Sequence, residues 1–206
     1  MLLMLVDNRH MHSWEALLPC GLKPSGMVST AFLSLAKADL RAAGQHLCEL
    51  PYGRNRYPGD PLAVLTERRG TCSTKHALLR RLAIEQGINL VLVLGIYEMN
   101  ERNTPGVGSV LQGHGLKSIP EAHCYARVGD KRIDVTRQRA RGEAEPISHF
   151  RHEEEIDPSQ ITIYKIGVHK SFLHQWITVT PGLGGLTLTC IWAIREECIA
   201  ALSQRP

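Results

Sequence analysis

The sequence predicts an α+β fold in which a helix that begins at Cys72 packs against an antiparallel sheet. Three observations predict it. Apolar residues recur with helical spacing over residues 72–86, a short run rich in Val, Leu and Ile follows over 89–97, and two further short runs flank 129–130. The chain is long enough for one domain with a substantial core, so we assign residues 1–206 to a single domain.

The N-terminal part of the chain predicts one long helix. Ser29 or Thr30 suits its N-cap, and apolar residues recur with helical spacing as far as about Cys48. Prolines and glycines over 51–59 then predict a loop.

The next helix is expected over residues 72–86. Thr71 suits its N-cap and Gly87 its C-terminal stop. Its apolar stripe consists of Leu78, Leu79, Leu82 and Ala83. The run 89–97 that follows is short enough for a buried strand.

The second half of the chain predicts a loop, a hairpin, a strand and a closing helix. Residues 99–120 are rich in glycine and predict an irregular loop that borders the functional groove as a lid. Residues 122–128 and 131–135 flank the Gly-Asp turn of a β-hairpin. We expect a further strand over 160–166 and a helix over 188–202, whose apolar side carries Ile191, Ile194, Cys198, Ile199 and Leu202.

Composition and charge exclude several classes of protein. The net charge of +4 comes from 24 basic and 20 acidic residues that are mixed along the chain, so we expect no nucleic-acid partner. One local basic excess, read as a solvated face, precedes the acidic run 153–155. It consists of Arg127, Lys131, Arg132, Arg137, Arg139 and Arg141.

The cysteines and the N-terminus predict a compartment. The six cysteines show no C-x-x-C spacing and are expected to be reduced thiols. The apolar stretch 1–6 is interrupted by Asp7 and is too short for a signal peptide or a membrane span. A cytoplasmic location without membrane contact is therefore expected.

Cys72 is the first candidate for chemistry because it lies in the first turn of a predicted helix, directly after Gly70 and Thr71. Unpaired N–H groups and the helix dipole favour thiolate there, and such cysteines reach pKa values of roughly 3.5 to 7.5. The same N–H groups can hold a developing oxyanion, and the backbone N–H of Cys72 supplies one such donor.

His123 and Asp134 are the second and third candidates. An even-numbered turn centred on 129–130 pairs Tyr125 with Asp134, so His123 lies diagonal to Asp134 on one face of the hairpin, within reach of a hydrogen bond. A carboxylate beside an imidazole fixes its tautomer and supports its protonated form. We therefore expect these two side chains to be in contact.

Together, Gly70-Thr71-Cys72, Glu121-Ala122-His123 and the run Arg132 to Thr136 resemble the transglutaminase-like branch of the papain-like cysteine enzymes. The resemblance covers roughly residues 62–136. It implies a papain-like fold, with flanking helical and strand regions, and the roles of nucleophile for Cys72, base for His123 and orienter for Asp134. Acyl transfer or hydrolysis at an amide of a peptide, protein or small molecule, through a thioester and without a cofactor, is then expected.

One position departs from that family. The protein-crosslinking transglutaminases carry a tryptophan after the nucleophile, and this chain carries Ser73. Protein crosslinking is therefore not implied, and hydrolysis and transfer to an amine both stay open.

Two alternatives use the same residues differently. Cys72, His76, His123 and Cys124 are of zinc-binding types, but neighbours on a strand point to opposite faces, so we expect no metal site. His76 is expected on the helix surface and Lys75 either beside the thiol or in solvent. The other alternative is a non-catalytic module that binds a peptide or protein in the same groove.

Overall fold

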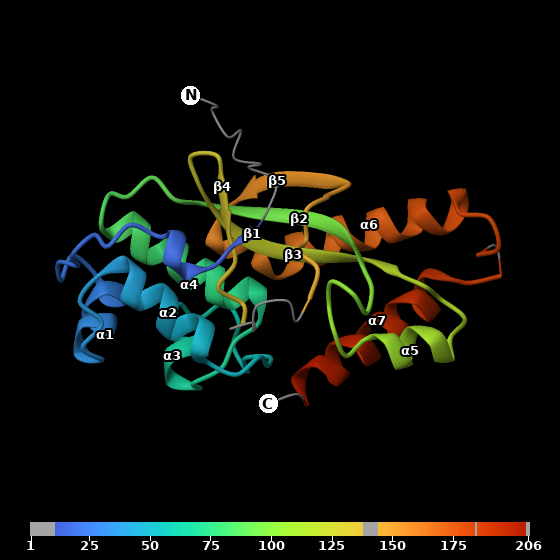
Figure 1. The fold of residues 1–206 in the computed structure, drawn as a ribbon, viewed down its shortest axis with the longest axis horizontal. Coiled ribbons are helices and arrows are strands. Elements are labelled where there is room, and N and C mark those ends of the chain that lie inside the picture. The colour runs from blue at the N-terminus through green and yellow to red at the C-terminus, as the bar shows by residue number, and fades with distance from the viewer. Residues whose placement is uncertain (1–10, 138–143, 184, 205–206) are drawn as a thin grey trace, which may run out of the picture.

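A five-stranded sheet with helices packed against it forms the computed structural model, which describes residues 11–137, 144–183 and 185–204 (Figure 1). The strands are β1 (Met11–His12), β2 (Val91–Met99), β3 (Ile119–Val128), β4 (Lys131–Ile133) and β5 (His152–Ile156). Their order in the sheet is β1-β4-β3-β2-β5, antiparallel except for the parallel pair β1 and β4. The expected α+β class is therefore correct at this level.

The helices gather into two groups. Their bounds are α1 (Met27–Ser34), α2 (Leu40–Glu49), α3 (Ala63–Thr66), α4 (Cys72–Glu85), α5 (Gly108–Gly113), α6 (Ile163–Val179) and α7 (Leu188–Ser203), with short 3-10 helices η1 (Trp14–Ala16) and η2 (Pro158–Ile161). In Figure 1, α1 to α4 lie on the left of the molecule and α5 to α7 on the right. The N-terminus of α4, where Cys72 stands, points toward the boundary between the two groups.

Helix α4 forms as its sequence predicts. The Thr71 side chain accepts from the N–H of Thr74, and the Thr74 hydroxyl accepts from the N–H of Thr71, so a capping box fixes the first turn. Gly87, with φ of +64°, ends the helix in the left-handed conformation that glycine adopts most readily. The predicted apolar stripe is buried against α1 and α2.

The hairpin forms with the predicted turn, but its second strand ends at Ile133 and not at Val135, so the expected pair of Tyr125 and Asp134 is absent from the ladder. Gly129, at φ +54°, and Asp130 make a two-residue turn, because Val128 is paired with Lys131. The ladder continues to Ala126 opposite Ile133 and ends there, since Asp134 donates its N–H to the His12 carbonyl of β1 at 2.8 Å. The residues of β3 that precede Ala126 have no partner in β4, and this part of β3 packs against α4.

The predicted helix over residues 29–48 is wrong, because two helices cover that range. The chain turns sharply at Ala36, with φ of 56°, and Asp39 then caps α2 by accepting from the N–H of Ala42. Neither Ser29 nor Thr30 is the first cap, since α1 begins at Met27.

The predicted strand over 160–166 is also wrong. Asp157 caps η2, in which Pro158 occupies the first position, and α6 follows directly. The strand in this region is β5, a charged segment at the sheet edge beside β2. Charged edge strands resist pairing with other chains, which explains why an acidic run can be a strand.

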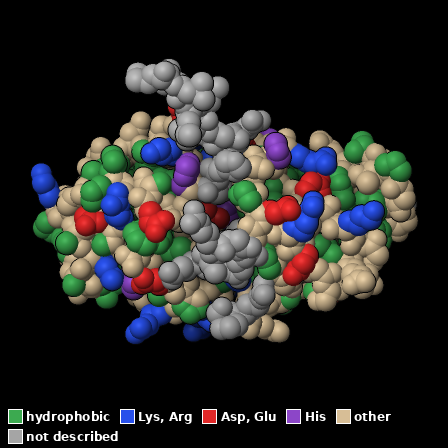
Figure 2. All heavy atoms as spheres, in the orientation of Figure 1, with side chains coloured by type: hydrophobic (Ala, Val, Ile, Leu, Met, Phe, Trp, Pro, Cys, Tyr) green, Lys and Arg blue, Asp and Glu red, His purple; other side chains and the backbone are tan. Residues whose placement is uncertain are grey.

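Two acidic residues of β5 pair with the basic cluster. Arg132 contacts Glu153 at 2.8 Å, and Arg127 contacts Glu155. Arg127 remains partly exposed and Glu155 exposed, so the solvated-face interpretation holds for Arg127, whereas Arg132 is more covered. Basic and acidic side chains are interspersed on the face that Figure 2 shows. Arg139, Arg141 and the apolar stretch 1–6 lie outside the described residues.

The C-terminal helix is confirmed. Helix α7 buries all five of the apolar residues expected on its inner side. They pack with α6, α5 and the far ends of β2 and β3. Within the described ranges, no helix has the length and apolar character needed to cross a bilayer.

Candidate active site

Cys72 is buried at the first position of α4, with only 7% of its surface exposed. It lies near Cys124, which stands on the part of β3 that β4 leaves unpaired. Because β4 ends at Ile133, the thiol can lie beside the edge of β3.

His123 and Asp134 are in contact as expected. Their Nε2 and Oδ2 atoms are 3.1 Å apart, and the imidazole is nearly buried. The other Asp134 oxygen accepts from the N–H of Thr136 at 2.7 Å. The Asp134 carboxylate is therefore held by the backbone two residues further on, and its other oxygen contacts His123.

His123 also lies beside Cys72, and each group shifts the pKa of the other. Because Nε2 is engaged by Asp134, the nitrogen that remains for sulfur is Nδ1. The structure thus brings the three residues singled out in the sequence together, with His123 next to both Asp134 and Cys72.

This chain of contacts shifts two pKa values toward an ion pair. Burial by itself raises the pKa of Cys72, but the charges of Lys165 and His123 outweigh it and lower the pKa to about 6. Burial likewise lowers the pKa of His123, but Asp134 and the Cys72 thiolate raise it to about 9. Between these values the site holds a thiolate and an imidazolium.

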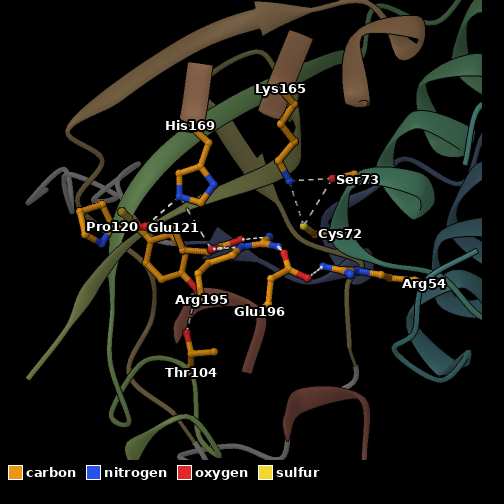
Figure 3. Close-up of polar contacts among 11 residues, drawn as sticks. Arg54, Cys72, Ser73, Thr104, Pro120, Glu121, Lys165, His169, Arg195 and Glu196 are labelled. Carbon is orange, nitrogen blue, oxygen red and sulfur yellow. Dashed lines mark hydrogen bonds and ion pairs between the residues drawn. The ribbon is translucent and has the colours of Figure 1, made fainter. Parts of the chain in front are cut away.

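Lys165 is a residue of this candidate site that the sequence did not indicate. It extends from α6 toward α4 and places Nζ at 2.7 Å from Ser73 Oγ and 3.9 Å from Cys72 Sγ (Figure 3). Had the sequence predicted a helix here, its spacing would have indicated that Lys165 is buried, because Lys165, His169 and Leu173 recur every four residues on one side of α6.

His76 is buried, which corrects its assignment to the helix surface. Its Nε2 accepts from the N–H of Val135 at 2.9 Å, so the ring proton sits on Nδ1, which donates to the Cys72 carbonyl at 2.7 Å. Burial lowers the pKa of His76 to about 4, and the ring is neutral at pH 7. His76 joins the first turn of α4 to the segment that carries Asp134.

Lys75 is neither solvated nor beside the thiol. Its Nζ donates to the carbonyls of Leu50 at 2.6 Å and Thr136 at 2.7 Å. Like His76, it ties α4 to the chain that follows β4.

Two cavities meet at Cys72. The first, of about 490 Å³, has His123 in its wall together with Tyr52, Tyr97 and Arg137. The second, of about 470 Å³, lies on the Lys165 side, and its walls include Trp192. We call them the His123 cavity and the Lys165 cavity.

The glycine-rich segment 99–120 borders this site, as expected. Met99, Thr104 and Pro105 line the His123 cavity, and Tyr97 donates to or accepts from the Thr104 hydroxyl at 2.8 Å. Its middle part forms α5, which packs on α7.

A buried ion pair joins β3 to the C-terminal helix beside the two cavities. Glu121 of β3 and Arg195 of α7 approach to 2.6 Å, and Arg195 also contacts Glu196 at 2.8 Å (Figure 3). Burial raises the pKa of Glu121, but Arg195 outweighs it and lowers the pKa to about 2. This pair ties α7 to the histidine strand.

The four residues considered for zinc have other partners. Both ring nitrogens of His76 bond to backbone groups, and His123 bonds to Asp134. In the part of the chain that the structure describes, no three His, Cys, Asp or Glu side chains are arranged to hold a metal ion.

Comparisons with known proteins add no relative. No protein-family model, no curated protein and no solved structure matches this chain.

Proposed function

We propose that this chain is a cysteine-dependent enzyme of the transglutaminase-like type, which acts on an amide carbonyl through a thioester on Cys72. One observation carries the proposal: a thiol at a helix N-terminus lies beside His123, which in turn contacts Asp134 at 3.1 Å. A nucleophile, a base and an orienting group in that relation are the parts that thiol acyl transfer needs.

The reaction follows from the ion pair. The Cys72 thiolate forms a bond to the carbonyl carbon, and the His123 imidazolium gives its proton to the leaving nitrogen as the carbon–nitrogen bond breaks. Water or an amine then attacks the thioester, His123 takes a proton from it, and the thiolate of Cys72 leaves. Asp134 keeps the imidazole in the orientation that both steps use.

The cavities support a substrate with a group on either side of the scissile bond. Each is large enough for an amino-acid side chain or a small organic group, and Cys72 lies where they meet. A peptide, a protein segment or a small amide fits this arrangement.

The rival proposal is a non-catalytic module that holds a peptide or protein in the same cavities. It requires no ionised thiol. The ion pair of Cys72 and His123 favours the enzyme, because a binding groove gains nothing from a buried thiolate.

Acylation by p-nitrophenyl acetate separates the two proposals. We expect a burst of p-nitrophenolate equal to the amount of protein, an acetyl group on the peptide that contains Cys72, and no burst with Cys72→Ala. Cys124→Ala is the matched control and should keep the burst. No burst from the unmodified chain would favour the binding module, and a panel of peptide and glutamine amides follows only if the burst is seen.

A further inference from the structure

Lys165 is buried, and no carboxylate among the described residues forms an ion pair with it. Only 7% of its surface is exposed. Its two polar contacts are Ser73 Oγ and Cys72 Sγ. A buried ammonium needs a counter-charge, and the anion it faces most closely is the thiolate of Cys72.

The surroundings of Lys165 support its protonated form. Burial opposes the charge, but the Cys72 thiolate comes next, followed by Cys124 and Glu121, and together they raise the pKa of Lys165. The influence is mutual, because the Lys165 charge is the largest of those that lower the pKa of Cys72. Thiolate and ammonium therefore stabilise one another.

We infer that Lys165 is a catalytic residue, which pairs with the Cys72 thiolate at rest and donates to the oxyanion when the substrate carbonyl is attacked. This inference rests on the proposed function. When Sγ bonds to carbon, its negative charge passes to the carbonyl oxygen, two bonds from sulfur. A donor 3.9 Å from Sγ is within hydrogen-bond reach of that oxygen.

Ser73 holds Lys165 in this position. It accepts from Nζ at 2.7 Å and lies 3.9 Å from Cys72 Sγ, so its own proton remains free to donate toward sulfur. A tryptophan at this position, as in the crosslinking transglutaminases, has no side-chain hydrogen-bond acceptor for an ammonium. Ser73, which stands where the crosslinking transglutaminases have tryptophan, thus supplies the hydrogen-bond acceptor for Lys165.

Two probes separate the two roles of Lys165. Alkylation by iodoacetamide needs a thiolate and forms no oxyanion, whereas acylation by p-nitrophenyl acetate needs both. For Lys165→Met we expect the alkylation midpoint to rise by about one pH unit or more. At pH 9, where the thiol is ionised in both proteins, acylation should fall about 100-fold while alkylation changes little.

Matched variants keep the test decisive. Lys170→Met removes an exposed lysine of the same helix and should change neither rate. Lys165→Arg should restore the midpoint, and Ser73→Ala should lower acylation less than Lys165→Met does. If Lys165→Met does not fold, the Arg and Ser73 variants carry the test.

Two results would go against the inference, and they differ from failure of the proposed function. An unchanged midpoint and an unchanged acylation rate at pH 9, in Ser73→Ala and in every Lys165 variant that folds, would make Lys165 a structural residue. Absence of acylation in the unmodified chain would instead remove the enzyme proposal itself.

Discussion

Three residues far apart in the sequence, Cys72, His123 and Asp134, meet at one site, and a fourth, Lys165, adds a positive charge beside the thiol. Burying any one of these charged groups without a partner would cost free energy of folding. Together the thiolate, imidazolium, carboxylate and ammonium balance one another, which is why the site can be both dry and charged.

The two pKa values predict a two-step pH profile for alkylation of Cys72. The thiolate forms as pH rises through about 6, and His123 loses its proton as pH rises through about 9. The rate with iodoacetamide should rise at the first step and again at the second, because a thiolate without an imidazolium partner is a better nucleophile.

Asp134→Asn should move the second step of that profile to lower pH. Asp134 is the strongest of the groups that raise the pKa of His123, so losing its charge lets the imidazole deprotonate sooner. The first step should remain. A second step that stays near pH 9 in this variant would show that Asp134 does not support the charged imidazole.

His76 acts by position and not by charge, because it is neutral at pH 7. His76→Leu leaves the buried N–H of Val135 without an acceptor and should cost about 1 to 3 kcal/mol of unfolding free energy in urea. The first alkylation midpoint should stay within a few tenths of a pH unit. A large shift in that midpoint would mean that His76 contributes charge to the thiol.

At the scale of the elements, α7 is joined to β3 by the buried pair of Glu121 and Arg195. Glu121→Gln removes one partner and leaves the guanidinium in a buried place, so we expect a loss of about 3 to 5 kcal/mol of unfolding free energy near pH 7. The matched control is Glu197→Gln on α7, whose partner His114 is at the surface, with an expected loss of about 0 to 1 kcal/mol.

The loss of unfolding free energy in Glu121→Gln should depend on pH. The folded pKa of Glu121 is depressed to about 2 from an ordinary value of 4.5, so its contribution is complete above about pH 4.5 and disappears as pH falls toward 2. The difference between the unmodified chain and Glu121→Gln should therefore shrink in acid. A difference that is constant from pH 7 to pH 3 would contradict the ion pair.

The elements that the sequence predicted well have local determinants. Thr71 and Gly87 define both ends of α4, and the Gly129-Asp130 turn sets the register that places His123 near Asp134. Such signals depend on neighbours in the chain, and a sequence displays them directly.

The elements that it predicted poorly depend on contacts distant in sequence. Residues 160–166 look like a strand because they are rich in β-branched residues, yet they form the end of η2 and the start of α6, whose buried side meets α4 and β3. His76 and Lys75 look like surface residues of a helix, yet their partners come from the chain after β4. Lys165 was missed for the same reason, since its partner is 92 residues away.

At the scale of the whole molecule, the site lies where the two groups of helices meet. Helix α4, from the first group, supplies Cys72, and α6, from the second, supplies Lys165, while the sheet between them supplies His123. The N-terminal and C-terminal parts of the chain are therefore both needed for one thiol to ionise.

The other cysteines serve as internal comparisons for that thiol. Burial raises the pKa of Cys124 and of Cys198 to about 11. Cys190 is the most demanding comparison, because it is exposed and the Thr187 hydroxyl, which donates to it at 3.2 Å, lowers its pKa.

The most direct test of the account is site-resolved alkylation by iodoacetamide at pH 6.5, read by mass spectrometry of the labelled peptides. At this pH an ordinary thiol of pKa about 8.5 is only about 1% ionised, whereas Cys72 should be mostly thiolate. Cys72 should therefore react well before the other five cysteines. His123→Ala should weaken that preference, because only the Lys165 charge then supports the thiolate, and His114→Ala, at an exposed histidine, should keep it. Labelling of Cys72 no faster than Cys190, and unchanged by His123→Ala, would contradict the ion pair and with it the proposed enzyme.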